Sequence, residues 1–307
     1  MTEVATEAGL SARPKIGALV QLLKPITWFP PMWAFGCGVV SAGGGLVDNW
    51  ALVIGGVLLA GPLVCGASQG VNDWFDRHVD AINEPNRPIP SGRVPGRWGL
   101  GFAIFWSILS LLCAWALGPL VFAAACVGMV LAWAYSAPPR LKLNGWWGNS
   151  AVAACYEGLP WFTGAVVITN ALPDWRILAL LALYSVGAHG IMTLNDFKSI
   201  DGDRRSGIRT LPVQLGADRA ARLACIVMAL PQIGVILLLL SWQQVLPALA
   251  IVGLLGLQIA AMTRMLRRPR ALAPWYNATG VTAYVAGMMV AAFAVRSLLQ
   301  SLEGGGL

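Results

Sequence analysis

The chain has 307 residues, of which 57% are hydrophobic and only 11% are charged. This composition excludes an ordinary water-soluble protein, because such proteins carry about 25% charged residues. We therefore predict an all-α membrane protein that crosses the bilayer many times. The formal net charge is +7; we attribute it to basic loops on one side of the membrane and expect no nucleic-acid partner.

A helix that spans a bilayer needs about 20 consecutive apolar residues, and windows of that length predict nine transmembrane helices. Their expected ranges are 27–47, 51–71, 98–117, 119–136, 150–169, 176–195, 220–241, 245–263 and 276–297. The N-terminal residues show no cleavable signal, so we expect the first helix to be retained. The expected organisation is an N-terminal cytoplasmic segment, a single nine-helix domain and a short tail, at residues 1–26, 27–299 and 300–307.

Basic residues are distributed unevenly along the chain. Of the 21 Lys and Arg residues, all but Arg176 and Arg296 lie in the N-terminal segment or near the loops after the second, fourth, sixth and eighth expected helices. Loops rich in Lys and Arg stay in the cytoplasm. We therefore predict that the N-terminus and these four loops are cytoplasmic and that the C-terminus lies on the other side.

Two polar segments repeat one pattern after the second and sixth expected helices. The first reads NDWFDRHVDAINEPNRPIPSG (residues 72–92), and the second reads NDFKSIDGDRRSGIRTLPVQLG (residues 195–216). Both helices run toward the cytoplasm, so both segments are expected at the same membrane face. The aligned positions are Asn72 with Asn195, Asp73 with Asp196, Asp76 with Ser199, and Asp80 with Asp203.

The aspartates of the first segment are spaced to share one helical face. At 100° per residue, Asp73, Asp76 and Asp80 fall within about 60° of one another, and Asp196 and Asp203 share a face by the same count. Neighbouring carboxylates repel unless a cation lies among them. Such oxygen ligands suit Mg²⁺, which binds one or two protein carboxylates together with substrate phosphates. The repeat therefore predicts a diphosphate held through Mg²⁺; the alternative is an ordinary acidic loop.

Together with YSAPPRLKLNGWWGN (residues 135–149), these segments resemble the UbiA superfamily of intramembrane prenyltransferases. More narrowly, they are similar to its chlorophyll and bacteriochlorophyll synthase branch, and closest to the bacterial members. The resemblance extends from about Trp28 over nearly the whole chain. It implies a helical bundle around a central cavity, with a cytoplasmic cap formed by the segments after the second and sixth helices.

The resemblance also implies an activity and a location. The activity is Mg²⁺-dependent transfer of a geranylgeranyl or phytyl group from its diphosphate to the propionate carboxylate of (bacterio)chlorophyllide a. The location is the inner, intracytoplasmic photosynthetic membrane of a bacterium, with both motifs on the cytoplasmic side. Proteins of pigment biosynthesis or photosystem assembly are expected as further partners.

Carried onto this sequence, the resemblance assigns residues to the site. The catalytic and Mg²⁺-binding candidates are Asp73, Asp76, Asp80, Asp196 and Asp203, with Asn72 and Asn195 beside them. Ser199 stands where many relatives outside the chlorophyll branch have Asp, which leaves the number of Mg²⁺ ions open. The family's Tyr-x-x-x-Lys element is incomplete, because Pro139 follows Tyr135 at the lysine position.

Cations near the motifs are candidates for contact with the diphosphate, since arginine and lysine bind phosphate oxygens well. Because Pro139 stands at the lysine position of the incomplete element, we expect either Lys142 or Arg140, which follow it, to contact the diphosphate. Five more cations either bind the diphosphate or set the topology of the loops: Arg77, Arg87, Lys198, Arg204 and Arg209. The aromatic residues expected either to line the cavity or to anchor the helices are Tyr135, Trp133, Trp146, Trp147 and Trp161.

Three polar residues lie within expected spans, where ionisable groups are functional candidates. His189 either binds the macrocycle's metal or a ring substituent, or bonds to a neighbouring helix. Glu157 either contacts the acceptor or pairs with a loop cation such as Arg140. Gln69 either orients the acceptor carboxylate or bridges two helices.

The expected chemistry needs no general base, because a carboxylate acceptor is already ionised near neutral pH. It does need a dry cavity, since water would compete for the allylic cation. Within the enzyme class, the alternative is a prenyltransferase for an aromatic quinone precursor. In another class, an ion-coupled transporter is disfavoured, because the acidic groups cluster on one side and the repeats run parallel.

Overall fold

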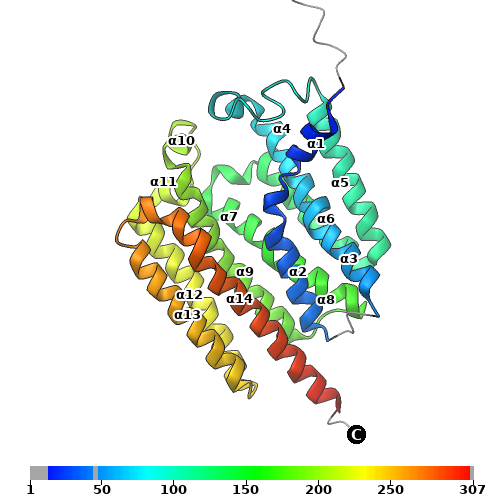
Figure 1. Ribbon diagram of the computed structural model, residues 1–307, viewed down its shortest axis with the longest axis vertical. Coiled ribbons are helices and arrows are strands. Elements are labelled where there is room, and N and C mark those ends of the chain that lie inside the picture. The colour runs from blue at the N-terminus through cyan, green and yellow to red at the C-terminus, as the bar shows by residue number, and fades with distance from the viewer. Residues whose placement is uncertain (1–12, 44–47, 305–307) are drawn as a thin grey trace, which may run out of the picture.

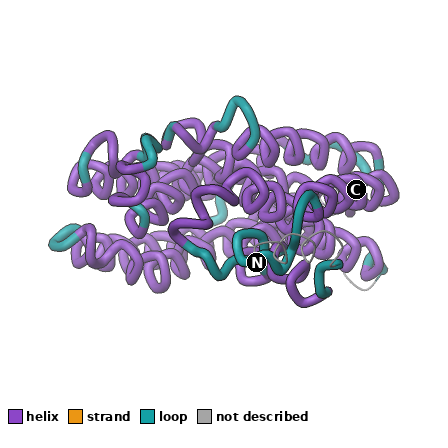
Figure 2. Tube along the Cα trace, turned by 90° about the horizontal axis from the view of Figure 1, so that it is seen from above, coloured by secondary structure: helices purple, strands orange, loops and turns teal. Residues whose placement is uncertain are grey.

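The computed structural model describes residues 13–43 and 48–304, and nearly all of that chain is helical (Figures 1 and 2). The only β-type pairing within these ranges is an isolated bridge between Asn144 and Arg209. The α-helices are α1 Ile16–Leu22, α2 Phe29–Ser41, α3 Trp50–Leu58, α4 Gly66–Asn83, α5 Trp98–Leu117, α6 Pro119–Ser136, α7 Gly145–Ala153, α8 Leu159–Thr169, α9 Trp175–Asn195, α10 Ile200–Arg205, α11 Leu211–Leu215, α12 Ala217–Ser241, α13 Val245–Met265 and α14 Pro269–Gly304. The other helical segments are η1 Pro25–Thr27, η2 Leu59–Cys65, η3 Leu141–Leu143, η4 Ala154–Gly158 and η5 Asp196–Lys198.

Eight helical stretches in the described ranges are long and apolar enough to cross a membrane, against nine expected. The difference lies at the first expected helix, 27–47. Its helix α2 has 13 residues and so extends over only about 20 Å, less than the roughly 30 Å of the hydrocarbon core. Residues 44–47 of that expected range lie outside the described residues.

Two of the spanning stretches pass through π-helical segments. Segment η2 joins α3 to α4, so that one helical stretch runs from Trp50 to Asn83. Segment η4 joins α7 to α8 in the same way, from Gly145 to Thr169. π-Helical insertions are frequent at functional sites, and η4 contributes Cys155 and Tyr156 to the lining of the cavity described below.

Helix boundaries follow local sequence signals. Gly118 has φ +133°, a conformation that favours glycine, and it makes the turn between α5 and α6. Asp174 caps α9 by accepting a 2.8 Å hydrogen bond from the backbone amide of Arg176. Asn170 ends α8 in the left-handed conformation.

Two glycines bring α2 and α8 into backbone contact. A Cβ atom on Gly38 would lie 2.0 Å from the Trp161 carbonyl oxygen, and one on Gly164 would lie 2.1 Å from that of Phe35. Small residues permit this close approach between helices in a membrane. The Trp161 ring is fully buried beside this contact and stacks on Tyr184 with 5.7 Å between ring centroids.

The two acidic segments meet at one end of the bundle. Figure 1 shows α4, which carries the aspartates of the first segment, at the same end as α10 and α11, which together carry half of the second segment. Helix α1 lies at that end too. The two halves of the repeat thus face one another across the centre of the molecule.

Candidate active site

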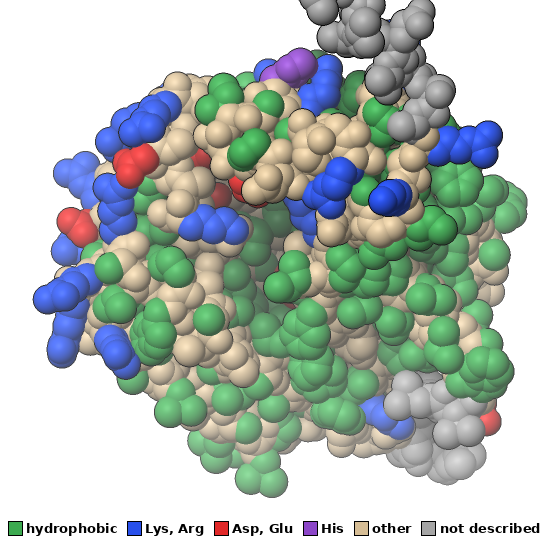
Figure 3. Space-filling model, turned by 45° about the horizontal axis from the view of Figure 1, so that its top comes forward, with side chains coloured by type: hydrophobic (Ala, Val, Ile, Leu, Met, Phe, Trp, Pro, Cys, Tyr) green, Lys and Arg blue, Asp and Glu red, His purple; other side chains and the backbone are tan. Residues whose placement is uncertain are grey.

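A cavity of about 810 Å³ lies between the two acidic segments. Figure 3, in which that end comes forward, shows a hollow with Lys and Arg side chains around it. Charged groups of both signs line the cavity. Its charged lining residues are Lys24, Asp73, Glu84, Arg87, Asp196 and Lys198.

Helix α4 continues past the three aspartates of the first segment and ends at Asn83, so these aspartates lie on one helix, as their spacing predicts. The side chain of Asp73 is only 2% exposed and lies 2.7 Å from Lys24 Nζ and 3.3 Å from an Arg87 nitrogen. The same Arg87 nitrogen is 2.8 Å from Asp80 Oδ2. The second oxygen of Asp73, Oδ2, is buried and has no hydrogen-bond partner.

Arg87 also forms a fork with Glu84, with distances of 2.6 and 2.7 Å to its two oxygens. Hydrogen bonding to this guanidinium lowers the pKa of the Glu84 carboxyl. Arg87 therefore connects the end of α4 to the cavity wall, and it joins three carboxylates of the first segment.

Asp76 points to a different partner. Its carboxylate forms an ion pair with Lys142 and accepts a 2.8 Å hydrogen bond from Asn72 Nδ2. Asn72 lines the cavity, whereas Asp76 and Lys142 are not among its lining residues. Of the two cations after Tyr135, Lys142 thus reaches the first segment, and Arg140 is exposed.

The second segment departs from the continuous helix on which its shared face was predicted. Helix α9 ends at Asn195, residues Asp196–Lys198 form a 3₁₀ turn, and α10 begins only at Ile200. Asp196 lines the cavity and accepts a 3.1 Å hydrogen bond from Asn149 Nδ2. Asn195 and Lys198 line it as well.

Asp203 lies away from the cavity lining. It accepts hydrogen bonds from Ser199 Oγ at 2.7 Å and Thr210 Oγ1 at 3.3 Å. Burial raises the pKa of the Asp203 carboxyl, although these two hydrogen bonds act in the opposite direction. Ser199, the residue that interrupts the repeat, is thus a hydrogen-bond donor to the next aspartate.

Three of the other candidate cations lie outside the cavity lining. The guanidinium of Arg77 covers the Trp74 ring at 4.1 Å and donates to the Trp74 carbonyl. Arg204 and Arg209 are exposed. The backbone of Arg209 nonetheless joins the second segment to the loop after α6, because its carbonyl accepts a 2.8 Å hydrogen bond from the amide of Gly145.

The three polar residues within the spans have different surroundings. Gln69 lines the cavity and bridges two helices by donating to the Tyr156 hydroxyl at 3.2 Å. Glu157 is buried with Oε2 unpartnered, and it forms no ion pair with Arg140 or any other described cation. His189 packs on Trp146, with ring centroids 5.8 Å apart, outside the cavity lining.

Only one of the five candidate aromatic residues lines the cavity. Tyr135 lines the cavity, as one of its two expected roles requires. None of the four tryptophans does. Trp146 and Trp147 are exposed, Trp161 is buried in the core, and Trp133 donates to Ser107 Oγ at 3.1 Å.

Sequence reasoning missed several lining residues, among them Lys24, Glu84 and Tyr156. Lys24 was assigned only to the N-terminal segment, yet it enters the cavity from the turn between α1 and η1. Tyr156 was not singled out, although it lies directly before Glu157. The only available signal for Lys24 was that it is the last cation before the first apolar run.

The ligand chemistry of the site is that of carboxylate and amide oxygens next to lysine and arginine. Among the described residues, no three His, Cys, Asp or Glu side chains converge on a single point. Mg²⁺ does not need such a cage, because it usually binds one or two protein carboxylates plus substrate phosphates. The unpartnered, buried Oδ2 of Asp73 is an oxygen of the required kind. The residues therefore fit Mg²⁺ bound jointly with a diphosphate.

A family model described as the UbiA prenyltransferase family matches residues 29–284. The chain belongs to this family, and it is a membrane-embedded prenyltransferase. The sequence-based assignment to the family is thereby confirmed.

Two similar proteins show which members of the family this chain resembles in sequence. A bacteriochlorophyll synthase 33 kDa chain from Cereibacter sphaeroides is 58% identical over 93% of this chain and 95% of that protein. A bacteriochlorophyll synthase 33 kDa chain from Rhodobacter capsulatus is 53% identical, over 92% and 94% of the two chains. The structure of a UbiA homologue from Archaeoglobus fulgidus bound to DMAPP and Mg²⁺ has a TM-score of 0.65 and 19% identity, and covers 91% of this chain and 99% of its own; this likeness shows the fold.

Proposed function

We propose that the protein transfers a geranylgeranyl or phytyl group from its diphosphate to the propionate carboxylate of (bacterio)chlorophyllide a. The observation that carries this proposal is that Asp73 and Asp196, from the two halves of the repeat, line one cavity together with Lys24, Arg87 and Lys198. The choice of a pigment acceptor is supported by the names of the two bacterial relatives and by their coverage of nearly the full chain.

The carboxylates have distinct proposed roles. Asp73 and Asp196 would hold Mg²⁺ from opposite walls, because both line the cavity. Asp76, Asp80 and Asp203 would complete the ligand set or fix its position from behind. When bound, Mg²⁺ supplies positive charge that stabilises the leaving diphosphate.

The chain's own cations act on the same leaving group. Lys24, Arg87 and Lys198 lie at the cavity surface, where their charges oppose the negative charge that develops on the diphosphate. Lys142 and Arg140 are further candidates on the neighbouring loop. The apolar residues deeper in the bundle exclude water from the allylic carbon, and an ionised propionate attacks it without a base.

The membrane arrangement completes the proposal. We place the N-terminus and both acidic segments in the cytoplasm, where the segments after α4 and α9 cap the cavity. Helix α2 would act as a ninth membrane helix within one domain at residues 27–299, despite its short length. The location would be the inner photosynthetic membrane of a bacterium, beside other proteins of pigment biosynthesis or photosystem assembly.

The test is an esterification assay on purified protein in detergent with Mg²⁺, geranylgeranyl diphosphate and bacteriochlorophyllide a. Asp73→Ala should abolish ester formation. The matched control is Asp201→Ala, because Asp201 lies in the second segment but is exposed and pairs with Arg270 on the surface. Equal losses in both variants, or none in Asp73→Ala, would reject the proposed site.

The acceptor is tested separately. Wild-type protein is given a phenolic quinone precursor in place of the pigment, with the same donor and metal. Prenylation of this acceptor without any pigment ester would reject the pigment assignment and favour the aromatic alternative.

A further inference from the structure

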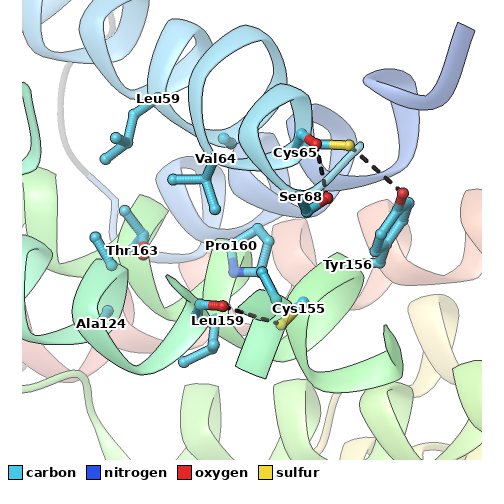
Figure 4. A pocket seen from close by; sticks show the side chains of 14 residues that line it. Leu59, Val64, Cys65, Ser68, Ala124, Cys155, Tyr156, Leu159, Pro160 and Thr163 are labelled. Atoms are coloured by element: carbon cyan, nitrogen blue, oxygen red, sulfur yellow. Dashed lines mark hydrogen bonds between the residues drawn. The ribbon is translucent and has the colours of Figure 1, made fainter. Parts of the chain in front are cut away.

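Tyr156 lines the active-site cavity, and a short hydrogen-bond network fixes its hydroxyl group. The residue belongs to the π-helical segment η4, and Gln69 on α4 lines the same cavity. Gln69 Nε2 donates to the Tyr156 hydroxyl oxygen at 3.2 Å, and Cys65 Sγ donates to it at 3.5 Å. Figure 4 shows the phenol from close by, with its hydroxyl group turned toward Cys65. Two positions of the helical stretch Trp50–Asn83 thus hold the phenol oxygen.

These two bonds leave the proton of the phenol free. A phenolic hydroxyl both donates and accepts hydrogen bonds, and here the oxygen already accepts two. The Cys65 thiol is buried and also contacts Thr27 Oγ1 at 3.4 Å, so a third segment, η1, helps to fix the sulfur. Tyr156 is therefore a hydrogen-bond donor whose oxygen is held in place and whose proton is available to a molecule in the cavity.

This donor lies close to the carboxylates that are proposed to hold Mg²⁺. Gln69 precedes Asp73 by four residues on α4, so it lies roughly 6 Å, or about one helical turn, further from the acidic end. Tyr156 is bonded to Gln69 and shares this level. Beyond it the surroundings are apolar and include Val64 and Leu159. The neutral donors therefore stand between the charged end of the site and the apolar interior of the bundle.

A carboxylate that attacks the prenyl group needs hydrogen-bond donors at this level. The allylic carbon is bonded directly to the diphosphate, so the attacking oxygen has to come within about 3–3.5 Å of that carbon, beside the acidic segments. Its negative charge is repelled there by the diphosphate and by the aspartates. A neutral donor offsets part of this repulsion without protonating the carboxylate, and its hydrogen bond to an ionised oxygen is about twice as strong as one to a neutral group.

We propose that the Tyr156 hydroxyl donates a hydrogen bond to the propionate carboxylate of the pigment and orients it toward the allylic carbon, with Gln69 as a positioning residue for this hydroxyl. This inference rests on the proposed function, because it takes the attacking group to be a carboxylate. One carboxylate oxygen bonds to the allylic carbon while the bond from that carbon to the diphosphate oxygen breaks, and the electron pair leaves with the diphosphate. Tyr156 keeps its proton throughout.

Two substitutions and two forms of the pigment test the hydrogen bond. Tyr156→Phe removes the hydroxyl group and keeps the ring. Tyr276→Phe is the matched control, because Tyr276 is fully buried outside the cavity lining and its hydroxyl contacts the Met228 sulfur at 4.0 Å. The pigments are bacteriochlorophyllide a and its propionate methyl ester, which has the same ring but no charge on the carboxyl group.

The experiment measures binding of each pigment to purified protein in detergent, followed by pigment fluorescence with Mg²⁺ and no prenyl donor. Tyr156→Phe should weaken the free propionate about tenfold or more, the size expected for a hydrogen bond to a charged group. It should weaken the methyl ester less than about threefold, because a neutral oxygen accepts a weaker bond. Tyr276→Phe should match wild type with both pigments.

A kinetic measurement separates action on the pigment from action on the prenyl donor. At saturating geranylgeranyl diphosphate, Tyr156→Phe should lower kcat/KM for bacteriochlorophyllide a about tenfold or more. At saturating pigment, the KM for geranylgeranyl diphosphate should stay within about twofold of wild type. A raised KM for the donor with an unchanged KM for the pigment would overturn the inference, because the hydroxyl would then act on the diphosphate.

Gln69→Leu tests the positioning role, and it stays informative if Tyr156→Phe does not fold. This substitution removes the N–H group that holds the phenol oxygen, so it should weaken the free propionate more than the methyl ester, by a smaller factor than Tyr156→Phe. The double variant should lose no more than Tyr156→Phe alone, because Gln69 then has no hydroxyl to hold. Equal effects of Gln69→Leu on both pigments, or a larger loss in the double variant, would overturn the positioning role.

The outcomes separate this inference from the proposed function. Equal weakening of both pigments by Tyr156→Phe, or no weakening of either, would overturn the hydrogen bond to the carboxylate. If wild-type protein esterifies bacteriochlorophyllide a and Tyr156→Phe does so equally well, the inference alone is rejected. If wild-type protein neither binds nor esterifies this pigment, the proposed function is rejected and the inference with it.

Discussion

Substitution of Lys24 tests whether a positive charge beside the proposed diphosphate site matters more for activity than a positive charge elsewhere in the N-terminal segment. Its ammonium lies 2.7 Å from Asp73 Oδ1, and the two side chains are 24% and 2% exposed. Lys24→Met keeps a long, flexible side chain and removes the ammonium group with its charge and its hydrogen-bond donors. Lys15→Met is the matched control, since Lys15 belongs to the same segment and is exposed.

The expected magnitude follows from the contacts. Removing one preorganised charge at a developing oxyanion costs about 10²–10³-fold in kcat, and we expect a loss in this range for Lys24→Met. The cost in stability should be less than the roughly 3–5 kcal/mol of an orphaned buried charge. The reason is that Arg87 still lies 3.3 Å from Asp73 after the substitution.

The assay is the initial rate of ester formation at saturating donor and acceptor, with thermal unfolding of each variant in detergent as the structural readout. Lys15→Met should match wild type in both. If Lys24→Met loses no more than a few-fold in rate, or if Lys15→Met loses as much, then Lys24 does not act on the leaving group.

Three further results are expected. Gly164→Ala should destabilise the protein by about 1–3 kcal/mol or more, because the new Cβ would lie 2.1 Å from a backbone oxygen of α2. The control variant Gly253→Ala should leave the stability unchanged, because Gly253 faces open space on α13. Equal melting temperatures of the two variants would refute the close contact between α2 and α8. Glu84→Gln should cost less than about 1 kcal/mol at neutral pH, because Glu84 is largely exposed. Arg87 lowers the pKa of Glu84, so the Glu84–Arg87 pair stabilises the fold above the ordinary glutamate pKa, and this stabilisation is lost as pH falls through the lowered pKa. A difference in stability between Glu84→Gln and wild type that grows toward low pH would contradict this pairing.

The spacing of residues predicts the first acidic segment well and the second only in part. Asp73, Asp76 and Asp80 lie on α4 because that helix continues to Asn83. A period of 3.6 residues describes any such uninterrupted helix. After Asn195 the helix instead gives way to a 3₁₀ turn, and no local pattern reveals that break.

The periodicity of the sequence does not predict contacts between distant segments. Lys24 and Asp73 are far apart in sequence, and so are Lys142 and Asp76. The sequence left Lys142 and Arg140 as alternatives. The structure pairs Lys142 with Asp76 and leaves Arg140 exposed. Such pairs depend on how whole helices pack, which the order of apolar and polar residues in one segment does not specify.

The most direct measurement is the stoichiometry of the reaction. Wild-type protein is incubated with Mg²⁺, geranylgeranyl diphosphate and bacteriochlorophyllide a, and the pigment product and pyrophosphate are quantified together by mass spectrometry and a coupled assay. We expect one geranylgeranyl ester at the propionate for each pyrophosphate released, and neither product without Mg²⁺. Pyrophosphate released without any pigment ester would contradict the proposed acceptor, and ester formed equally well after removal of Mg²⁺ would contradict the proposed role of the carboxylates.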